Sequence, residues 1–252
     1  MTDSIIDERR WWSKAILVGG VVAICCVLVG SLGVRIGLWP YGTGFTFLTG
    51  GAVLAVIGLF LGIIAYAVCL RKGLRAERSG ILIGILLSAV ILAQLGVQYA
   101  AVTTVPAIHN ISTDTIDPPA FNKLVAIREA EGANPLVYDA ELLAEQQQVA
   151  YPKVKTLISA EPTKVLFTQA MVVLEDLGLE IVNEDTAAGM IEATATTFWF
   201  GFKDDVVVRI RSTANGSLID VRSVSRVGQS DLGANAKRIR AILNGLESKH
   251  QD

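Results

Sequence analysis

An uncharged run fills residues 15–34 and has the sequence AILVGGVVAICCVLVGSLGV. A helix needs about 20 mainly apolar residues to cross the hydrocarbon core of a bilayer, so this run is long enough to span one. Two further apolar runs follow, and the three predicted spans cover residues 15–37, 45–70 and 80–102. Three such runs in succession are not typical of a water-soluble core. We therefore predict a three-helix transmembrane anchor over residues 1–104.

The composition of the chain agrees with an anchor joined to an ordinary domain. Of the 252 residues, 52% are hydrophobic and 18% are charged, whereas a typical soluble domain has about 25% charged residues. Residues 1–104 carry 8 basic and 4 acidic side chains, but residues 105–252 carry 14 basic and 20 acidic ones. An acidic C-terminal half predicts no nucleic-acid partner, because binding to phosphate backbones needs clustered positive charge.

The basic residues around the spans predict how the chain crosses the membrane. Basic residues are enriched on the cytoplasmic side of membrane proteins. The loop between the first two spans has only Arg35, whereas the N-terminal segment and the loop between the second and third spans have Arg9, Arg10, Lys14, Arg71, Lys72, Arg75 and Arg78. The N-terminus is therefore predicted to be cytoplasmic. An odd number of spans then places the C-terminal domain in the periplasm of a bacterium, with the anchor in the inner (plasma) membrane.

Glycine pairs four residues apart recur in or beside the predicted spans. They are Gly33 and Gly37, Gly58 and Gly62, and Gly80 and Gly84. Small residues let helix backbones approach closely in lipid, so these pairs are candidates for helix–helix contacts; the alternative is that glycine is simply common in membrane helices. No ionisable residue lies in the middle of a span, which argues against a transport path formed by this chain alone.

The remainder of the chain predicts an α+β domain. Residues 105–119 are rich in Thr, Ser, Asp and Pro and are expected to form a linker, and the domain proper covers residues 120–252. Apolar periodicity predicts a short helix over residues 139–151, a helix over 161–178, strands over 179–182, 190–197, 205–212 and 218–225, and a final helix over 232–246. The clearest part is thus α-β-β-β-β-α with an antiparallel sheet, and Asn215-Gly216 marks a hairpin turn.

Both longer helices are expected to pack on one face of this sheet. Side chains alternate between the faces of a strand, so the opposite face collects polar residues. These residues are Glu192, Thr194, Thr196, Arg209, Arg211 and Arg222. That face is expected to be either polar and open or covered by another part of the chain.

Two longer motifs carry a resemblance to a known family. Residues 192–209 have the sequence EATATTFWFGFKDDVVVR, and residues 219–239 have the sequence IDVRSVSRVGQSDLGANAKRI. Residues 117–248 resemble the bacterial family called domain of unknown function 1499. The fusion to three N-terminal spans resembles one arrangement of that family. The family has no established reaction, so the resemblance implies no catalytic residue.

Few side chains in the sequence are suited to catalysis or metal binding. His109 lies in the predicted linker and His250 in the tail, while Cys25, Cys26 and Cys69 lie in or at the end of spans. A Ser/His/Asp triad and a zinc site both need such groups close together in one domain. We therefore predict no catalytic residue, no metal site and no cofactor.

Adjacent acidic residues offer a weaker candidate. Asp204 and Asp205 follow a predicted turn at Lys203-Asp204 and are expected to be solvated turn carboxylates. Neighbouring strand residues point to opposite faces, so the two carboxylates are not expected to act together.

One group of candidate binding residues surrounds the predicted start of the final helix. It consists of Arg226, Ser230, Asp231, Asn235 and Arg238. The N-terminal amides of a helix favour anions, and Arg226 would add a positive charge. In the alternative interpretation, Ser230 or Asp231 caps the helix while Arg226 pairs with Asp231.

A second candidate group lies in the aromatic stretch of residues 198–202. Trp199 and Phe202, with the neighbouring Lys203, would meet lipid or a partner protein if their rings leave the core. About half of the rings in this stretch should do so, because successive strand residues alternate faces. The alternative is that they pack beneath the first helix of the domain and the linker.

Together these features predict a non-enzymatic membrane protein whose outer domain binds an envelope protein or an anionic lipid, in addition to the bilayer around its spans. Two alternatives remain open. One is an envelope hydrolase or lipid-modifying enzyme that uses Asp205, Asp231 or Ser230 together with Arg226. The other is an accessory subunit of a transporter, which only the glycine-rich spans suggest.

Overall fold

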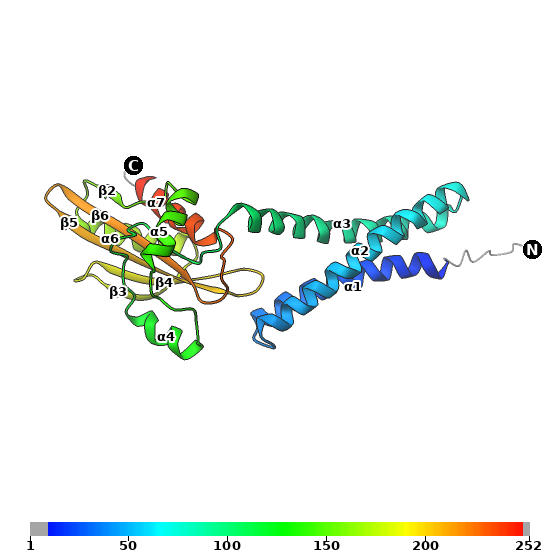
Figure 1. The fold of residues 1–252 in the computed structure, drawn as a ribbon, viewed down its shortest axis with the longest axis horizontal. Coiled ribbons are helices and arrows are strands. Elements are labelled where there is room, and N and C mark those ends of the chain that lie inside the picture. The colour runs from blue at the N-terminus through cyan, green and yellow to red at the C-terminus, as the bar shows by residue number, and fades with distance from the viewer. Residues whose placement is uncertain (1–9, 249–252) are drawn as a thin grey trace, which may run out of the picture. The chain divides into compact units, whose positions relative to one another are not determined.

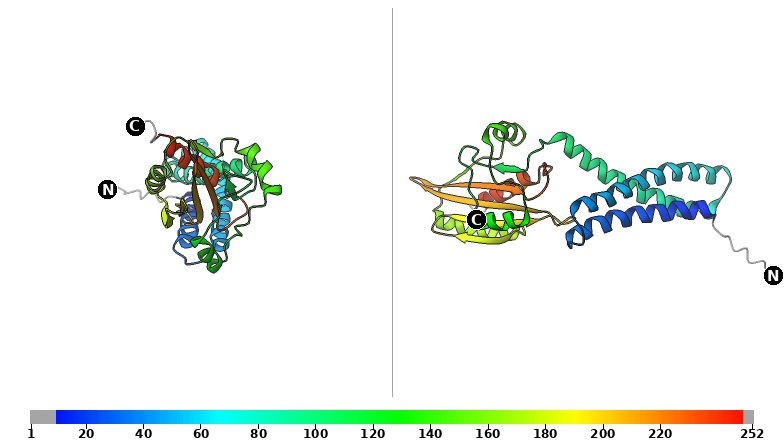
Figure 2. Two further views of the ribbon diagram at one scale, coloured as in Figure 1. Left: turned by 90° about the vertical axis from the view of Figure 1, so that its left-hand side faces the viewer. Right: turned by 60° about the horizontal axis from the view of Figure 1, so that its bottom comes forward.

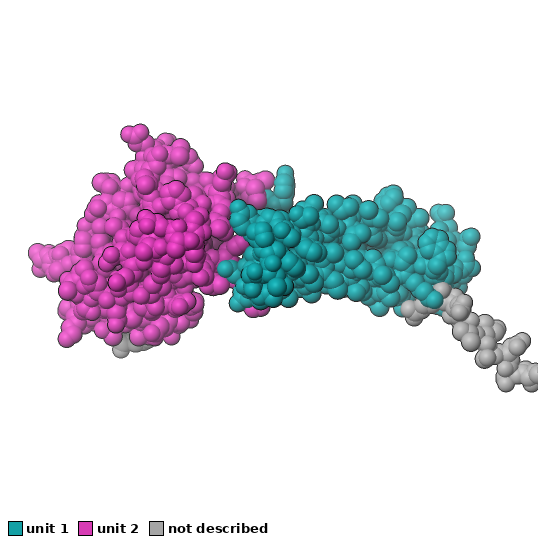
Figure 3. All heavy atoms as spheres, turned by 90° about the horizontal axis from the view of Figure 1, so that it is seen from below, with its two compact units in different colours: residues 1–100, 199–201 teal, residues 101–198, 202–252 magenta. Residues whose placement is uncertain are grey.

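The computed structural model of the protein describes residues 10–248. The chain divides into two compact units, one of residues 1–100 with 199–201 and one of residues 101–198 with 202–252 (Figure 3). The predicted tail residue His250 lies outside the described residues. Each unit has its own hydrophobic core.

Three helices form the first unit: α1 (Trp11–Arg35), α2 (Tyr41–Arg71) and α3 (Arg75–Thr104) (Figure 1). All three are long and apolar enough to cross a membrane, which confirms the predicted candidate spans. Helix α3 begins five residues earlier than predicted and includes the buried Glu77. The Glu77 carboxylate accepts hydrogen bonds from the Arg10 backbone N–H, at 2.8 Å, and from the Ser13 hydroxyl at the start of α1. The bond from Arg10 satisfies a backbone N–H that the N-terminus of α1 leaves without an intrahelical partner.

Glycines allow close contacts between these helices. A Cβ atom on Gly84 of α3 would lie 2.6 Å from the carbonyl oxygen of Ile16 in α1, and a Cβ atom on Gly20 would lie 3.0 Å from the Gly84 oxygen. Gly58 and Gly62 of α2 face Ser88 and Ile85 of α3 in the same way. Helix packing through Gly84 and through the pair in α2 is thereby confirmed.

The predicted contact through Gly33 and Gly37 is wrong. Gly33 lies against the indole ring of Trp39, where a Cβ atom would come within 2.0 Å of the ring. Gly37 has φ +74° and belongs to the turn after α1. The Trp39 indole N–H donates to the Gly30 carbonyl at 3.3 Å. Gly33 therefore leaves room for the Trp39 ring and Gly37 allows the turn, because α1 ends before Gly37.

A Gly84→Ala substitution is expected to lower the thermal unfolding midpoint of the full-length protein in detergent micelles. The new methyl group meets backbone, so α1 and α3 must separate, and overpacking of this kind costs about 1–3 kcal/mol. Gly96→Ala is the matched control on the same helix, because a Cβ atom there has no neighbour within 4 Å. The control has the same gain in helix propensity, of about 1 kcal/mol. Equal midpoints for the two variants would contradict close packing at Gly84.

Within the described residues, the second unit is an antiparallel sheet with four helices. Its strands are β1 (Asn110–Ser112), β2 (Leu157–Ser159), β3 (Glu180–Asp185), β4 (Met190–Thr196), β5 (Lys203–Thr213) and β6 (Gly216–Ser225). Its helices are α4 (Lys123–Glu131), α5 (Ala140–Ala150), α6 (Thr163–Asp176) and α7 (Ala234–Ser248). The strand order is β1-β6-β5-β4-β3, and β2 also pairs with β6. The right-hand view of Figure 2 shows the long β5–β6 hairpin in orange. The α+β class and the order of α6, four strands and α7 are confirmed.

Three elements of the second unit were not predicted: β1, β2 and α4. The two strands have three residues each and exist because both pair with the same edge of β6. Strand β1 lies within the stretch that we expected to be a linker, and Ile108 and Ile111 are buried in the core. The predicted short helix is present as α5, and its buried Gln147 exchanges two hydrogen bonds with the backbone of Ser112. This side chain closes the outer edge of β1.

The hairpin between β5 and β6 is present, but its turn is shifted by one residue from the expected Asn-Gly turn. Thr213 pairs with Gly216, so the two turn residues are Ala214 and Asn215. Gly216 has φ +137°, and a Cβ atom there would lie 2.1 Å from the Ser159 oxygen of β2. The glycine is needed because β2 crosses closely at this point.

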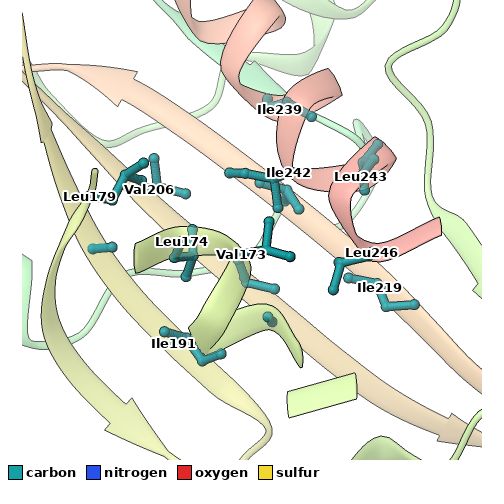
Figure 4. Packing of buried hydrophobic residues seen from close by; sticks show 14 of the residues in the cluster. Val173, Leu174, Leu179, Ile191, Val206, Ile219, Ile239, Ile242, Leu243 and Leu246 are labelled. Carbon is teal, nitrogen blue, oxygen red and sulfur yellow. The ribbon is translucent and has the colours of Figure 1, made fainter. Parts of the chain in front are cut away.

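The main core lies between the sheet and the helices α6 and α7. Figure 4 shows Val173 and Leu174 of α6 and Ile242 of α7 directed toward Ile191 and Val206 of the strands. These strand residues alternate with the polar ones, as period two requires. Both long helices of the domain therefore cover one face, as predicted.

The opposite face of the sheet is covered rather than open. Phe121, just before α4, and Leu124, within α4, form a smaller core with Val207 and Val224 of the strands. Most of the polar residues predicted for this face are therefore buried or half-buried. Glu192, Thr194 and Arg222 are buried, and Arg209 and Arg211 are half-buried. Thr196 is exposed. The covering segment supplies their partners.

Candidate functional site

Asp205 is the centre of a buried ionic network beneath α4. Its carboxylate accepts hydrogen bonds from Arg128 at 2.6 Å, from Arg226 at 2.7 and 2.9 Å, and from the Thr194 hydroxyl at 2.8 Å. Arg226 also contacts Glu131 of α4 at 2.7 Å. Burial by itself raises the pKa of Asp205, but the bonds from Arg226, Thr194 and Arg128 outweigh it and the pKa is lowered. The carboxylate therefore stays ionised, and each of its two oxygens already accepts two hydrogen bonds.

The prediction of solvated turn carboxylates is wrong. Asp204 and Asp205 lie in β5, which begins at Lys203, and their exposed fractions are 4% and 0%. Their expected separation is confirmed, because Asp204 points to the other face and pairs with Arg238 of α7 at 2.7 Å. Each aspartate thus joins one covering helix to the sheet.

The residues predicted around the start of the final helix are divided between these two networks. Arg226 binds Asp205 and Glu131 and does not form the expected pair with Asp231. Asp231 accepts hydrogen bonds from the backbone N–H groups of Gly233, at 2.8 Å, and Asn235, at 2.7 Å, so its predicted capping role is confirmed. Burial, the largest effect, raises the pKa of Asp231.

Asn235 and Arg238 hold α7 to the sheet. The Asn235 amide donates to the Ser225 hydroxyl at 2.9 Å and to the His109 carbonyl at 3.0 Å. Arg238 donates to the Ser223 hydroxyl at 3.0 Å and to Asp204. Both side chains therefore have a structural role, because their hydrogen bonds hold α7 on the sheet.

Ser230 is half-buried, and the aromatic group is partly exposed. The Ser230 hydroxyl accepts from the Leu232 N–H at 3.3 Å. Phe198 and Trp199 have exposed fractions of 74% and 54%, whereas Phe202 is half-buried. The Lys203 ammonium lies 3.7 Å from Glu131. The expectation that Trp199, Phe202 and Lys203 contact lipid or a partner stays a prediction.

The other arginines of the covered face are also matched within the domain. Arg209 and Arg211 contact the buried Asp220 at 3.1 and 2.7 Å. Both also contact Asp114, and Arg209 donates to Asp117 at 2.9 Å. These charges hold the covering segment on the sheet and leave little charge for a ligand.

A group of basic residues elsewhere on the domain is different. A cleft of about 540 Å³ lies between α7 and the segment that leads into β2. Its lining residues are Lys153, Lys155, Thr156, Leu157, Lys237, Arg240, Ala241, Leu243, Asn244 and Glu247. We call it the basic cleft. Its four cations are exposed and, within residues 10–248, none of them forms an ion pair with a carboxylate.

Local structure explains how the basic cleft forms. Residues 237, 240 and 244 are three and four positions apart on α7, so they share one helix face, while Ile239 and Ile242 are buried on another. Strand β2 pairs with residues 217–219 of β6 and thereby brings Lys153 and Lys155 to the cleft. The spacing in α7 was visible in the sequence, but the pairing of a three-residue strand was not. We therefore did not predict these residues as a site.

No metal centre is formed by the part of the chain that the structure describes. Within residues 10–248, no group of three or more His, Cys, Asp or Glu side chains is arranged to hold a metal ion. His109 lies beside β1, and its Nδ1 is 3.4 Å from the Gln229 carbonyl oxygen.

Comparison with known protein families assigns the C-terminal domain to a family. Residues 110–246 match the model of a family described as protein of unknown function (DUF1499). The chain belongs to the DUF1499 family. The matched region runs from β1 into α7 and contains the Asp205 network and nine of the ten residues of the basic cleft. Among curated proteins, no match to the chain was found.

Proposed function

We propose that this DUF1499 protein is a membrane-anchored binding module whose C-terminal domain lies outside the cytoplasm and binds an anionic ligand in the basic cleft. The observation that carries the proposal is the set of four exposed cations without carboxylate partners in residues 10–248. Residues 105–252 carry 20 acidic and 14 basic side chains, so this concentration of positive charge goes against the average of the domain. Unpaired clustered cations attract anions electrostatically.

The internal charges of the domain support binding at the cleft rather than at the network under α4. Asp205 and Arg226 are buried and matched to each other, and Asp231 is used by the start of α7. A general acid or base must reach the substrate within hydrogen-bond distance. These groups already have internal partners, so binding is favoured over the hydrolase alternative.

The proposed location rests on the charge pattern of the first unit. Basic residues precede α1 and surround the α2–α3 turn, and the three candidate spans are odd in number. The positive-inside rule then puts the start of α1 in the cytoplasm and the end of α3 outside. In a bacterium with two membranes, the domain would face the periplasm.

Cysteine labelling tests the location and the binding together. Cys25, Cys26 and Cys69 are replaced by alanine in the full-length protein, and Asn244→Cys places one thiol in the basic cleft. We expect a membrane-impermeant maleimide to label this thiol in intact spheroplasts, and millimolar pyrophosphate or citrate to slow the labelling. Lys164→Cys, at an exposed position outside the cleft, is the control and should be labelled at the same rate with or without either anion.

Two outcomes would contradict the proposal. Labelling of Asn244→Cys only after lysis would place the domain in the cytoplasm. Labelling in intact spheroplasts that neither anion slows would leave the location standing and remove the binding function.

A further inference from the structure

We infer that the ligand of the basic cleft is a phosphoryl group with at least two negative charges, attached to a hydroxyl-bearing body. This inference rests on the proposed function and gives the chemistry of the ligand. A phosphomonoester on a hydroxyl-bearing body occurs in the headgroup of a phosphoinositide lipid and in a soluble sugar or glycerol phosphate. The experiment below distinguishes these sources.

The cations of the basic cleft come from two separate walls. Lys237 and Arg240 are one turn apart on α7, whereas Lys153 and Lys155 lie on the segment that enters β2. Each wall carries two cations, the α7 wall also carries the Glu247 carboxylate, and the space between the walls is about 540 Å³. A single anion with several acceptor oxygens can contact both walls at once. A monovalent anion would leave most of the positive charge unneutralised.

The residue types favour phosphate over a planar carboxylate. Three of the four cations are lysines, which bind phosphate as point charges from any side. Arginine recognises both carboxylates and phosphates in a bidentate manner, and Arg240 is the single arginine of the lining, so the charge and the number of acceptor oxygens decide between the two anions. A phosphomonoester carries about 1.5 to 2 negative charges at pH 7 and three acceptor oxygens. It therefore matches cations on both walls.

The remaining lining residues indicate which chemical groups the rest of the ligand carries beside its phosphoryl group. Asn244 and Glu247 lie on α7 beyond Arg240 and offer an amide and a carboxylate. A carboxylate accepts hydrogen bonds from hydroxyl groups and repels a further anion. Leu157 and Leu243 add apolar surface to the same cleft. A small body with hydroxyl groups, such as glycerol or a sugar, fits these groups better than a second carboxylate does.

Isothermal titration calorimetry on the full-length protein in phosphatidylcholine nanodiscs tests this inference. The probes are glycerol 3-phosphate, citrate and acetate at equal ionic strength. We expect glycerol 3-phosphate to bind at least about tenfold more tightly than either carboxylate, because charge-assisted bonds to phosphate form on both walls. Lys153→Gln and Arg240→Gln, one from each wall, should each weaken its binding roughly three- to tenfold. Lys164→Gln, outside the cleft, should leave it unchanged.

Dihexanoyl phosphatidylinositol 4-phosphate, whose headgroup carries a phosphomonoester and free hydroxyl groups, is the second phosphoryl probe and identifies the source. Tighter binding than glycerol 3-phosphate would support a lipid headgroup, and equal or weaker binding would support a soluble ligand. Citrate as the tightest ligand, with the same dependence on Lys153 and Arg240, would overturn the phosphoryl inference while the anion-binding function stands. If no probe binds in a manner that depends on these two residues, both proposals fail.

Discussion

Replacement of Asp205 by asparagine is expected to lower the free energy of unfolding by about 3–5 kcal/mol, the usual cost of removing one partner from a buried ionic network. The carboxylate has no exposed surface and receives hydrogen bonds from Arg128, Arg226 and Thr194. Asparagine has the same shape, but it leaves two buried guanidinium groups without their shared counter-ion. Urea unfolding of the full-length protein in detergent micelles, followed by near-UV circular dichroism, measures the loss.

The acid side of the stability curve provides a second measurement for this variant. The pKa of Asp205 is lowered in the folded protein from its ordinary value of 3.8. Its contribution is therefore fully present above pH 3.8 and is lost as the pH falls through the lower, folded-state value. We expect the difference in stability between the wild type and Asp205→Asn to shrink below pH 3.8.

The control for Asp205→Asn is Glu184→Gln, which removes an exposed carboxylate from the neighbouring sheet edge. It should change the free energy of unfolding by less than about 0.5 kcal/mol. An effect of Asp205→Asn no larger than that of the control would show that the network does not stabilise the domain. A difference from the wild type that does not change with pH would show that the charge of Asp205 is not what stabilises it.

Replacement of Arg222 by methionine is expected to cost about 2–4 kcal/mol, because several buried acceptors lose their donor. The Arg222 guanidinium donates to the Asn110 side chain at 3.0 Å, to the Pro119 carbonyl at 3.1 Å and to the Leu136 carbonyl. Burial lowers the pKa of Arg222 to about 10, so the side chain is still charged at pH 7. Its carbon Cζ also lies 5.5 Å from the centre of the Phe121 ring.

These contacts connect β6 to the segment that covers the sheet. We therefore expect Arg222→Met to increase protease cleavage within residues 113–138 as well as to lower the unfolding midpoint. Arg211→Met is the control, since its side chain is 41% exposed and Asp220 retains Arg209 as a partner. A change of less than about 1 kcal/mol is expected there. Equal cleavage of both variants would contradict a role for Arg222 in holding the segment.

Local patterns in the sequence predicted the elements that depend on local physics. Uncharged runs of about 20 residues predict membrane spans because lipid cannot solvate charge. Period two in residues 190–197 correctly separated Ile191 and Ala193, in the core, from Glu192 and Thr194 on the other face. The start of α7 was less accurate. Leu232 and Gly233 have positive φ, and the helix begins after them at Ala234.

Charged residues were harder to interpret because burial depends on distant parts of the chain. Asp204 and Asp205 resemble a solvated turn in the sequence, yet each is paired with an arginine on a covering helix. The partner Arg128 is 77 residues away from Asp205. Hydrophobic periodicity carries no information about such pairs.

By itself, the sequence determined the three apolar spans, the α+β order of α6, four strands and α7, and the polar face of β4, β5 and β6. These follow from hydrophobicity and backbone period, which act over a few neighbouring residues. Only the tertiary structure decided that α4 covers the polar face and that the four cations of the basic cleft come together. Those features depend on β6, whose edge pairs with both β1 and β2, because such short strands gain their stability from pairing with another strand.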